Sequence, residues 1–85
     1  MSTSTVVDVV GWIGVVLLLA AYALVSNRKM EGDSLGYQAF NVLGAAFLII
    51  NSFYYGALPS VGVNVVWIGI AGYTIVKKLS GAKAA

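Results

Sequence analysis

The residues of this sequence that could do chemistry are amides and aromatic rings rather than acids, bases or nucleophiles. No His and no Cys is present, which excludes the commonest general base, thiolate metal sites and Cys nucleophiles. In the long uncharged run after residue 33, the candidate polar side chains include Gln38, Asn41, Asn51, Ser52, Asn64, Trp67, Tyr73 and Thr74. Because an amide offers both donors and acceptors, and an aromatic face covers the apolar side of a ring, this set suits a neutral, hydroxylated ligand.

Helical spacing gathers these groups on two faces. Asn64, Trp67 and Ala71 share one face. A second stripe, at alternating spacings of three and four, consists of Gln38, Asn41, Ala45, Leu48, Ser52 and Tyr55. Asn51 lies about 80° from Asn41 on an ideal helix. The candidate solute-binding residues are therefore Asn64, Asn41, Asn51 and Trp67. The alternative is structural, because amides in membrane helices often bond to a neighbouring helix and Trp often anchors at the membrane surface.

Composition indicates lipid rather than water as the solvent. The 85 residues suffice for one small domain, and they are 60% hydrophobic and only 9% charged. A soluble domain usually carries about 25% charged residues. Five basic residues and a net charge of +2 make no extended basic face, so nucleic-acid binding is not expected.

Charge spacing predicts three membrane helices. Residues 9–27 are free of charge, and so are the 43 residues 34–76. A spanning helix needs about 20 apolar residues, so the first run fits one helix and the second fits two. The second run breaks at a turn, residues 55–59, that ends on the only proline of the chain. We predict a single all-α membrane domain, residues 1–85, with helices at 6–26, 35–55 and 60–78.

Local signals suggest where these helices begin and end. Residues 5–8 fit a capping box, and Asp33 or Ser34 can cap the second helix. Ser80 and Gly81 predict a stop after the third helix. Glycines are plentiful in all three predicted helices, and we expect them mainly to let the helices pack together, although they could also form a seam between subunits.

The basic residues predict the topology. Three passes put the loop at 27–34 and the C-terminus on one side, together with all five Lys and Arg residues. The positive-inside rule then places the N-terminus outside and the C-terminus in the cytoplasm. We expect no cleaved signal peptide, because residues 1–5 carry no basic side chain.

Proton coupling and enzyme activity are not expected. Pumps generally use Asp, Glu or His within the membrane, and the predicted spans offer no ionisable relay apart from Tyr. The side-chain carboxylates are Asp8, Glu31 and Asp33, and the last two look like a solvated loop pair. No metal or cofactor is predicted.

The chain resembles the bacterial half-transporters called SemiSWEETs. The resemblance covers roughly residues 9–78, and its most specific part is Leu58–Val66, in which Pro59 is followed five residues later by Asn64. Residues 33–44 also resemble that family's entry to the second helix. The resemblance implies that two three-helix protomers pair in parallel as a six-helix sugar pore, and that Asn64 contacts the sugar.

Two departures mark a divergent member. The Pro-Gln pair of the family's first helix is absent, because residues 18–22 read Leu-Leu-Ala-Ala-Tyr. The family also places a Trp on the second helix, where this chain has Leu48. A sugar would need Phe47, Tyr55 or Trp67 as its stacking partner instead.

The sequence therefore supports two hypotheses. The first is a facilitative transporter of a small neutral solute, such as a mono- or disaccharide, without ion coupling. It would be a parallel homodimer in the bacterial inner membrane, because three helices cannot surround a solute-sized path, and its path would be lined by the first and third helices. The second is a structural or accessory subunit of a larger membrane complex.

Overall fold

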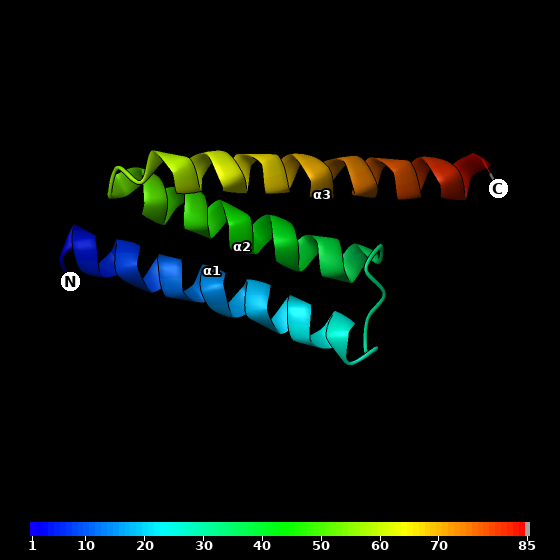
Figure 1. Ribbon diagram of the computed structural model, residues 1–85, viewed down its shortest axis with the longest axis horizontal. Helices are drawn as coiled ribbons and strands as arrows, with labels where there is room; N and C mark the ends of the chain where they lie inside the picture. Colours follow the sequence, from blue (N-terminus) through cyan, green and yellow to red (C-terminus); the bar gives the residue numbers. More distant parts are fainter. Residues whose placement is uncertain (85) are drawn as a thin grey trace.

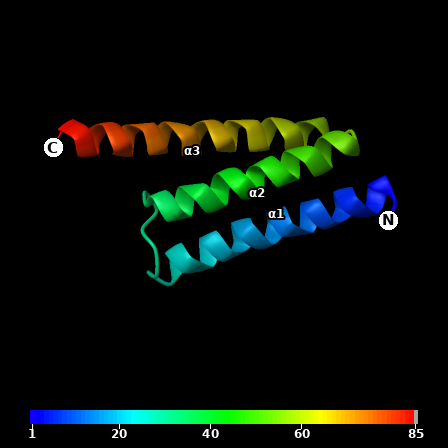
Figure 2. The same ribbon diagram turned by 180° about the vertical axis from the view of Figure 1, so that it is seen from behind.

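The fold is a single layer of three antiparallel helices. The computed structural model describes residues 1–84 and the side chains of residues 1–81. Helix α1 spans Thr3–Ser26, α2 spans Leu35–Tyr54 and α3 spans Leu58–Ala84. Within the described residues, α1 and α3 each pack against α2 and not against each other. Both ribbon views show α2 between its two partners (Figures 1 and 2).

All three helices are long and apolar enough to cross a membrane. This confirms the predicted class, an all-helical chain with three candidate spans. The N-terminus and the α2–α3 turn lie at one end of the layer, and the α1–α2 loop and the C-terminal end of α3 lie at the other (Figure 1). The charged loop and Lys77 and Lys78 of α3 are therefore gathered at the second end.

The N-terminal caps confirm one expectation and correct another. The Ser34 hydroxyl accepts a hydrogen bond from the Tyr37 amide at 3.2 Å, as predicted for the start of α2. Helix α1, however, begins three residues before the predicted start at residue 6. Its cap is Ser2, whose hydroxyl accepts from the Thr5 amide at 3.2 Å. The predicted capping box at residues 5–8 is wrong because these residues are already helical.

Both connections use the same turn. At the end of α1 the Lys29 amide bonds to the Leu24 carbonyl at 2.8 Å, and Arg28 adopts a left-handed φ of 59°. After α2 the Ala57 amide bonds to the Ser52 carbonyl at 2.8 Å, with Gly56 at φ 72°. This is the Schellman arrangement, which satisfies the last carbonyls of a helix.

The bounds of α3 differ from the predicted 60–78 at both ends. Because Gly56 alone reverses the chain, α3 starts at Leu58, and Pro59 takes a first-turn position where its missing N–H costs nothing. At its other end the helix passes through Ser80 and Gly81 to Ala84, so the predicted stop is wrong. A glycine inside a helix costs only about 1 kcal/mol, which is too little to end it.

The interior is made of small and amide side chains, and the large apolar side chains point outward. The buried apolar residues are Val7, Ala21, Ala45 and Ala71, and the buried polar ones are Gln38, Asn41 and Ser52. In contrast, Trp12, Leu19 and Phe53 are each more than 60% exposed. In water this arrangement would be unfavourable, whereas in lipid a large apolar side chain gains little by turning inward.

Glycines bring α1 and α2 together. A Cβ added to Gly14 would lie 2.8 Å from the backbone oxygen of Gly44, and one added to Gly11 would collide with the Asn51 amide. These three glycines are buried in the α1–α2 seam, as expected for intramolecular packing. On α3, by contrast, a Cβ at Gly62, Gly69 or Gly72 would meet nothing within 4 Å.

We therefore predict that Gly14→Ala destabilises the protein by about 1–3 kcal/mol, because the new methyl group forces the two backbones apart. The matched control is Gly72→Ala, which has room for a Cβ and should be neutral or stabilising by about 0.5–1 kcal/mol. Helical signal during denaturation in detergent measures both. Equal stability of the two variants would contradict the close contact.

Candidate functional site

A hydrogen bond between α2 and α3 joins two of the four predicted site residues. The Trp67 Nε1–H donates to the Asn41 Oδ1 at 3.4 Å. Asn41 is only 5% exposed, whereas Trp67 is 45% exposed at the rim of the same seam. The pair thus presents a buried amide behind a partly open indole ring.

This pair lines a hollow of about 170 Å³, which we call the midhelix hollow. Its other lining residues are Tyr37, Gln38, Ile70 and Ala71. At 1.5 Å per residue, Asn41 lies about 5 Å from the centre of α2, and Trp67 lies at the centre of the uncharged part of α3, residues 58–76. The hollow is therefore near the middle of the span, and none of its side chains is charged.

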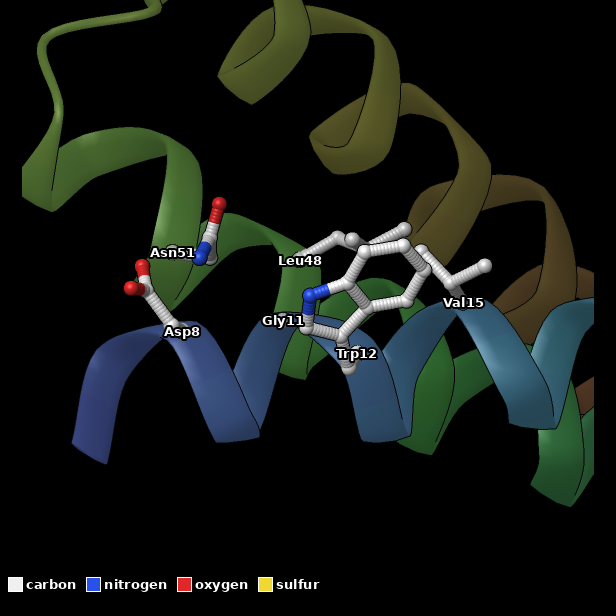
Figure 3. A pocket seen from close by; sticks show the side chains of 6 residues that line it. All are labelled: Asp8, Gly11, Trp12, Val15, Leu48 and Asn51. Atoms are coloured by element: carbon white, nitrogen blue, oxygen red, sulfur yellow. The ribbon is translucent and has the colours of Figure 1, made fainter. Parts of the chain in front are cut away.

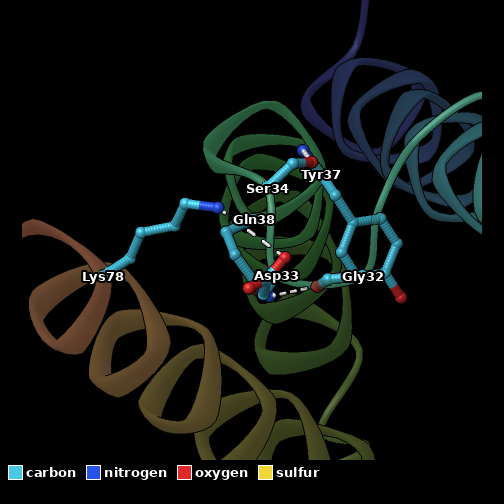
Figure 4. A network of polar contacts seen from close by, with 6 residues as sticks. All are labelled: Gly32, Asp33, Ser34, Tyr37, Gln38 and Lys78. Atoms are coloured by element: carbon cyan, nitrogen blue, oxygen red, sulfur yellow. Dashed lines mark hydrogen bonds and ion pairs between the residues drawn. The ribbon is translucent and has the colours of Figure 1, made fainter. Parts of the chain in front are cut away.

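Gln38, which also lines the midhelix hollow, is hydrogen-bonded to the α1–α2 loop. Its Nε2 donates to the Gly32 carbonyl of the α1–α2 loop at 2.9 Å (Figure 4). The bond fixes the loop against the first turns of α2, so the Gln38 amide both lines the hollow and holds the loop.

Asn51 lies on the other side of α2, where it binds α1. Its Nδ2 donates to the Val7 carbonyl at 3.0 Å, and Gly11 leaves the space that the amide fills. The structure therefore does not bring Asn51 together with Asn41. Its observed contact is the one that the structural alternative expected, a bond to a neighbouring helix.

Asn64 is half-buried on α3 and does not line the midhelix hollow as described. Its Nδ2 donates to the Ser60 carbonyl one turn earlier, at 2.9 Å. Trp67 follows three residues later, which places the two side chains on neighbouring positions of one helix face.

The predicted stripe on α2 divides between two partners. Gln38, Asn41, Ala45 and Ser52 are buried, as the spacing indicates. Leu48 and Tyr55 instead turn to α1: Leu48 packs beside Gly14, and Tyr55 bonds to Asp8. The division arises because α2 has a helix on each side, which a single helical period cannot indicate.

A second polar hollow, of about 160 Å³, lies near the start of α1, and we call it the N-terminal hollow (Figure 3). It is lined by Asp8, Gly11, Trp12, Val15, Leu48 and Asn51. The Tyr55 hydroxyl donates to Asp8 Oδ1 beside it. Asp8 thus belongs to the helical part of α1, about 8 Å from its start.

The sequence alone does not indicate this pair. The spacing of residues 5–8 predicts that Asp8 is part of a cap, and no ionisable relay is predicted within the spans. The available signal was topological, since the start of α1 and the end of α2 must meet at one end of an antiparallel pair.

The Asp8 carboxylate raises the pKa of Tyr55 above its ordinary value of 10.0, first by accepting the phenolic hydrogen and then by repelling a phenolate. The contribution of the Tyr55–Asp8 hydrogen bond to the stability of the fold is therefore fully present below pH 10, and it is lost as the pH rises through the raised pKa of Tyr55. We predict that Asp8→Asn lowers the pKa of Tyr55 toward 10.0.

Phenolate absorbance during an alkaline titration measures this shift, and Tyr55→Phe identifies which of the five tyrosines is responsible. If Asp8→Asn left the titration curve of the wild type unchanged, the Asp8–Tyr55 bond would not exist in solution.

The described residues contain no group of three or more His, Cys, Asp or Glu side chains that could hold a metal ion.

Comparison with curated proteins and with solved structures gave no match. A family model that carries no functional description matches residues 7–83. Because the match runs from the first turns of α1 to the last turn of α3, the chain belongs to this family, whose function is not known.

Proposed function

We propose that the protein is a facilitative membrane transporter of a small neutral solute, built as a parallel homodimer. The observation that carries the proposal is the Asn41–Trp67 pair at the midhelix hollow. Since Trp67 occupies the Asn41 oxygen, the Asn41 NH₂ group is the part that a solute hydroxyl would meet. The exposed indole offers a face for an apolar ring surface.

The size of the hollow supports a second copy. At about 170 Å³ it is smaller than the roughly 300–1,000 Å³ of an ordinary small-molecule site. A single layer of helices also cannot enclose a path, since one face of each seam stays open. A partner placed over the Trp67 side of α3 would complete the site from two half-sites, and the midspan position agrees with transporters built from paired repeats.

The charge distribution supports transport without ion coupling. Asp8 is the only acidic residue within the three helices, and it lies near the end of α1 rather than at the hollow. Ion-coupled transporters generally carry ionisable groups along their substrate pathway. A neutral solute moving down its gradient needs none.

The resemblance to SemiSWEETs makes a mono- or disaccharide the first solute to test, and it assigns Asn64 to sugar contact. Asn64 neighbours Trp67 on α3, so a solute against the indole ring lies within reach of both. Asn51 has a bracing role in this proposal, because its amide holds α1 against α2.

We further propose that the protein resides in a bacterial inner membrane with the N-terminus outside and the C-terminus in the cytoplasm. Support comes from the gathering of Arg28, Lys29, Lys77 and Lys78 at one end of the helices, which the positive-inside rule assigns to the cytoplasm.

We predict saturable uptake of at least one labelled sugar into proteoliposomes, and loss of uptake in Asn64→Ala and Trp67→Leu. Each removes a group that the solute would contact, while leaving the α1–α2 seam intact. Helical content and reconstitution efficiency are measured in parallel to establish that the variants fold.

The matched control is Asn27→Ala. Asn27 Nδ2 donates to the Ala23 carbonyl four residues earlier at 2.8 Å, which reproduces the Asn64 bond outside the helix interior. Equal loss in Asn27→Ala and Asn64→Ala would assign the effect to helix stability rather than to solute binding.

A single introduced Cys tests the dimer, because the chain has none of its own. Val63 shares the exposed face of Trp67 and Ile70 and lies about 6 Å from the centre of the uncharged part of α3, residues 58–76. We predict that Val63→Cys forms a disulfide between two copies in the membrane. An antiparallel pair would hold the two Cys residues about 12 Å apart, so it would not cross-link.

Gly69→Cys is the control on another side of α3, where a Cβ meets nothing within 4 Å. Cross-linking at Gly69→Cys but not at Val63→Cys would place the subunit seam away from the hollow and contradict the shared site.

The second candidate is an accessory subunit of a larger membrane complex. The observation that favours it is the exposure of α3, since only 6% of the residues in its most apolar stretch are buried within the chain. Absence of uptake together with co-purification of a larger partner at fixed stoichiometry would support this alternative over transport.

A further inference from the structure

A third hollow lies at the charged end of the molecule, between the start of α2 and the last part of α3. It measures about 370 Å³ and is lined by Asp33, Tyr73, Thr74, Lys77 and Lys78. We call it the basic hollow. It takes no part in the proposed transport site, and its lining is the most strongly charged of the hollows described here.

An ion pair holds one of its two ammonium groups in place. Lys78 Nζ lies 3.6 Å from Asp33 Oδ1, and the two side chains are 40% and 67% exposed (Figure 4). A pair this exposed adds little to stability, so its structural effect is to orient Lys78 over the hollow. With Lys77 beside it, the lining carries two ammonium groups and one carboxylate, a net charge of +1.

The donors available to a ligand can be identified. The Thr74 hydroxyl already donates to the Ile70 carbonyl at 3.0 Å, so it offers a ligand only an acceptor. Lys77, Lys78 and the phenol of Tyr73 can donate. Two ammonium groups and a phenol at one rim suit the oxygens of a phosphate group.

The depth of the hollow matches the lipid headgroups. Lys77 and Lys78 lie 19 and 20 residues beyond Leu58, which is about 30 Å along α3 and equals the thickness of the hydrocarbon core. Tyr73 lies slightly deeper, at the level expected for an interfacial aromatic ring.

An apolar track continues from the hollow toward the membrane centre. Val66 and Tyr73 are 61% and 68% exposed and share a helix face with Lys77, beside the face of Val63 and Trp67 that the proposed dimer would cover. A free phosphate would leave this track unused, whereas a phospholipid would lay an acyl chain along it.

We propose that the basic hollow binds the phosphate group of an anionic phospholipid, with Lys77, Lys78 and Tyr73 as donors and the exposed side chains of Val66 and Tyr73 as the acyl contact. This site requires insertion into a membrane but not transport, so it stands independently of the transport proposal.

Native mass spectrometry in a neutral detergent tests the site, with phosphatidylglycerol as the probe. Since each Lys near a membrane surface contributes about 1 kcal/mol, Lys77→Gln should weaken binding roughly fivefold. Asp33→Asn removes the carboxylate that competes with the phosphate, and it should bind phosphatidylglycerol more tightly than the wild type.

The matched control is Lys29→Gln, which removes the same charge at the same end from an exposed loop position outside the hollow. It should leave the affinity within twofold of the wild type. An equal loss in Lys29→Gln and Lys77→Gln would overturn the site in favour of diffuse attraction between the basic end and anionic lipid.

Inorganic phosphate and phosphatidylcholine separate the sources of the phosphate. We expect neither to displace phosphatidylglycerol at equal concentration. Displacement by inorganic phosphate would show a site for free phosphate, and displacement by phosphatidylcholine would show that the lipid's net charge is not recognised. Either result would contradict the proposal.

Discussion

The fold depends on α2 having a partner helix on each of two sides. In lipid, apolar burial gives helices little reason to associate, so close backbone contact and hydrogen bonds between helices must hold them together. Toward α1, α2 supplies Gly44 and the Asn51 amide. Toward α3 it supplies Asn41, which is buried and accepts from Trp67. The middle helix therefore carries the small and polar side chains that make the contacts and hydrogen bonds with both outer helices.

This constraint also explains where the hollows lie. Where glycines bring the two backbones into contact, as at Gly14 and Gly44, the α1–α2 seam leaves no space for a ligand. The α2–α3 seam has a bulky indole at its rim in place of a second glycine, and the midhelix hollow forms beside it. The two charged hollows lie at opposite ends of the layer, each between two helices that no connection joins at that end, and polar groups there can reach the membrane surface.

The residues that line the midhelix hollow could be anticipated only in part. Residue type indicated Asn41 and Trp67 as candidates, and helical spacing indicated the buried positions Gln38, Ala45 and Ser52. Spacing could not show that Asn51 serves a different partner, because the angle between two side chains on one helix does not say what stands opposite each. The Asp8–Tyr55 bond was missed for the same reason, since its two residues are 47 positions apart and meet only when α1 and α2 pack.

Charge and hydropathy by themselves determined that the chain has three helices of spanning length, where the charged end lies, and that no His or Cys chemistry occurs. These properties are local or additive along the chain, so no packing is needed to read them. The order of the helices in the layer was decided only by the tertiary structure. The tertiary structure also decided the turn that starts α3 at Leu58 and the hydrogen-bond partner of each side-chain amide. Each of these depends on which backbones can approach closely, and that is a property of two helices together rather than of either sequence alone.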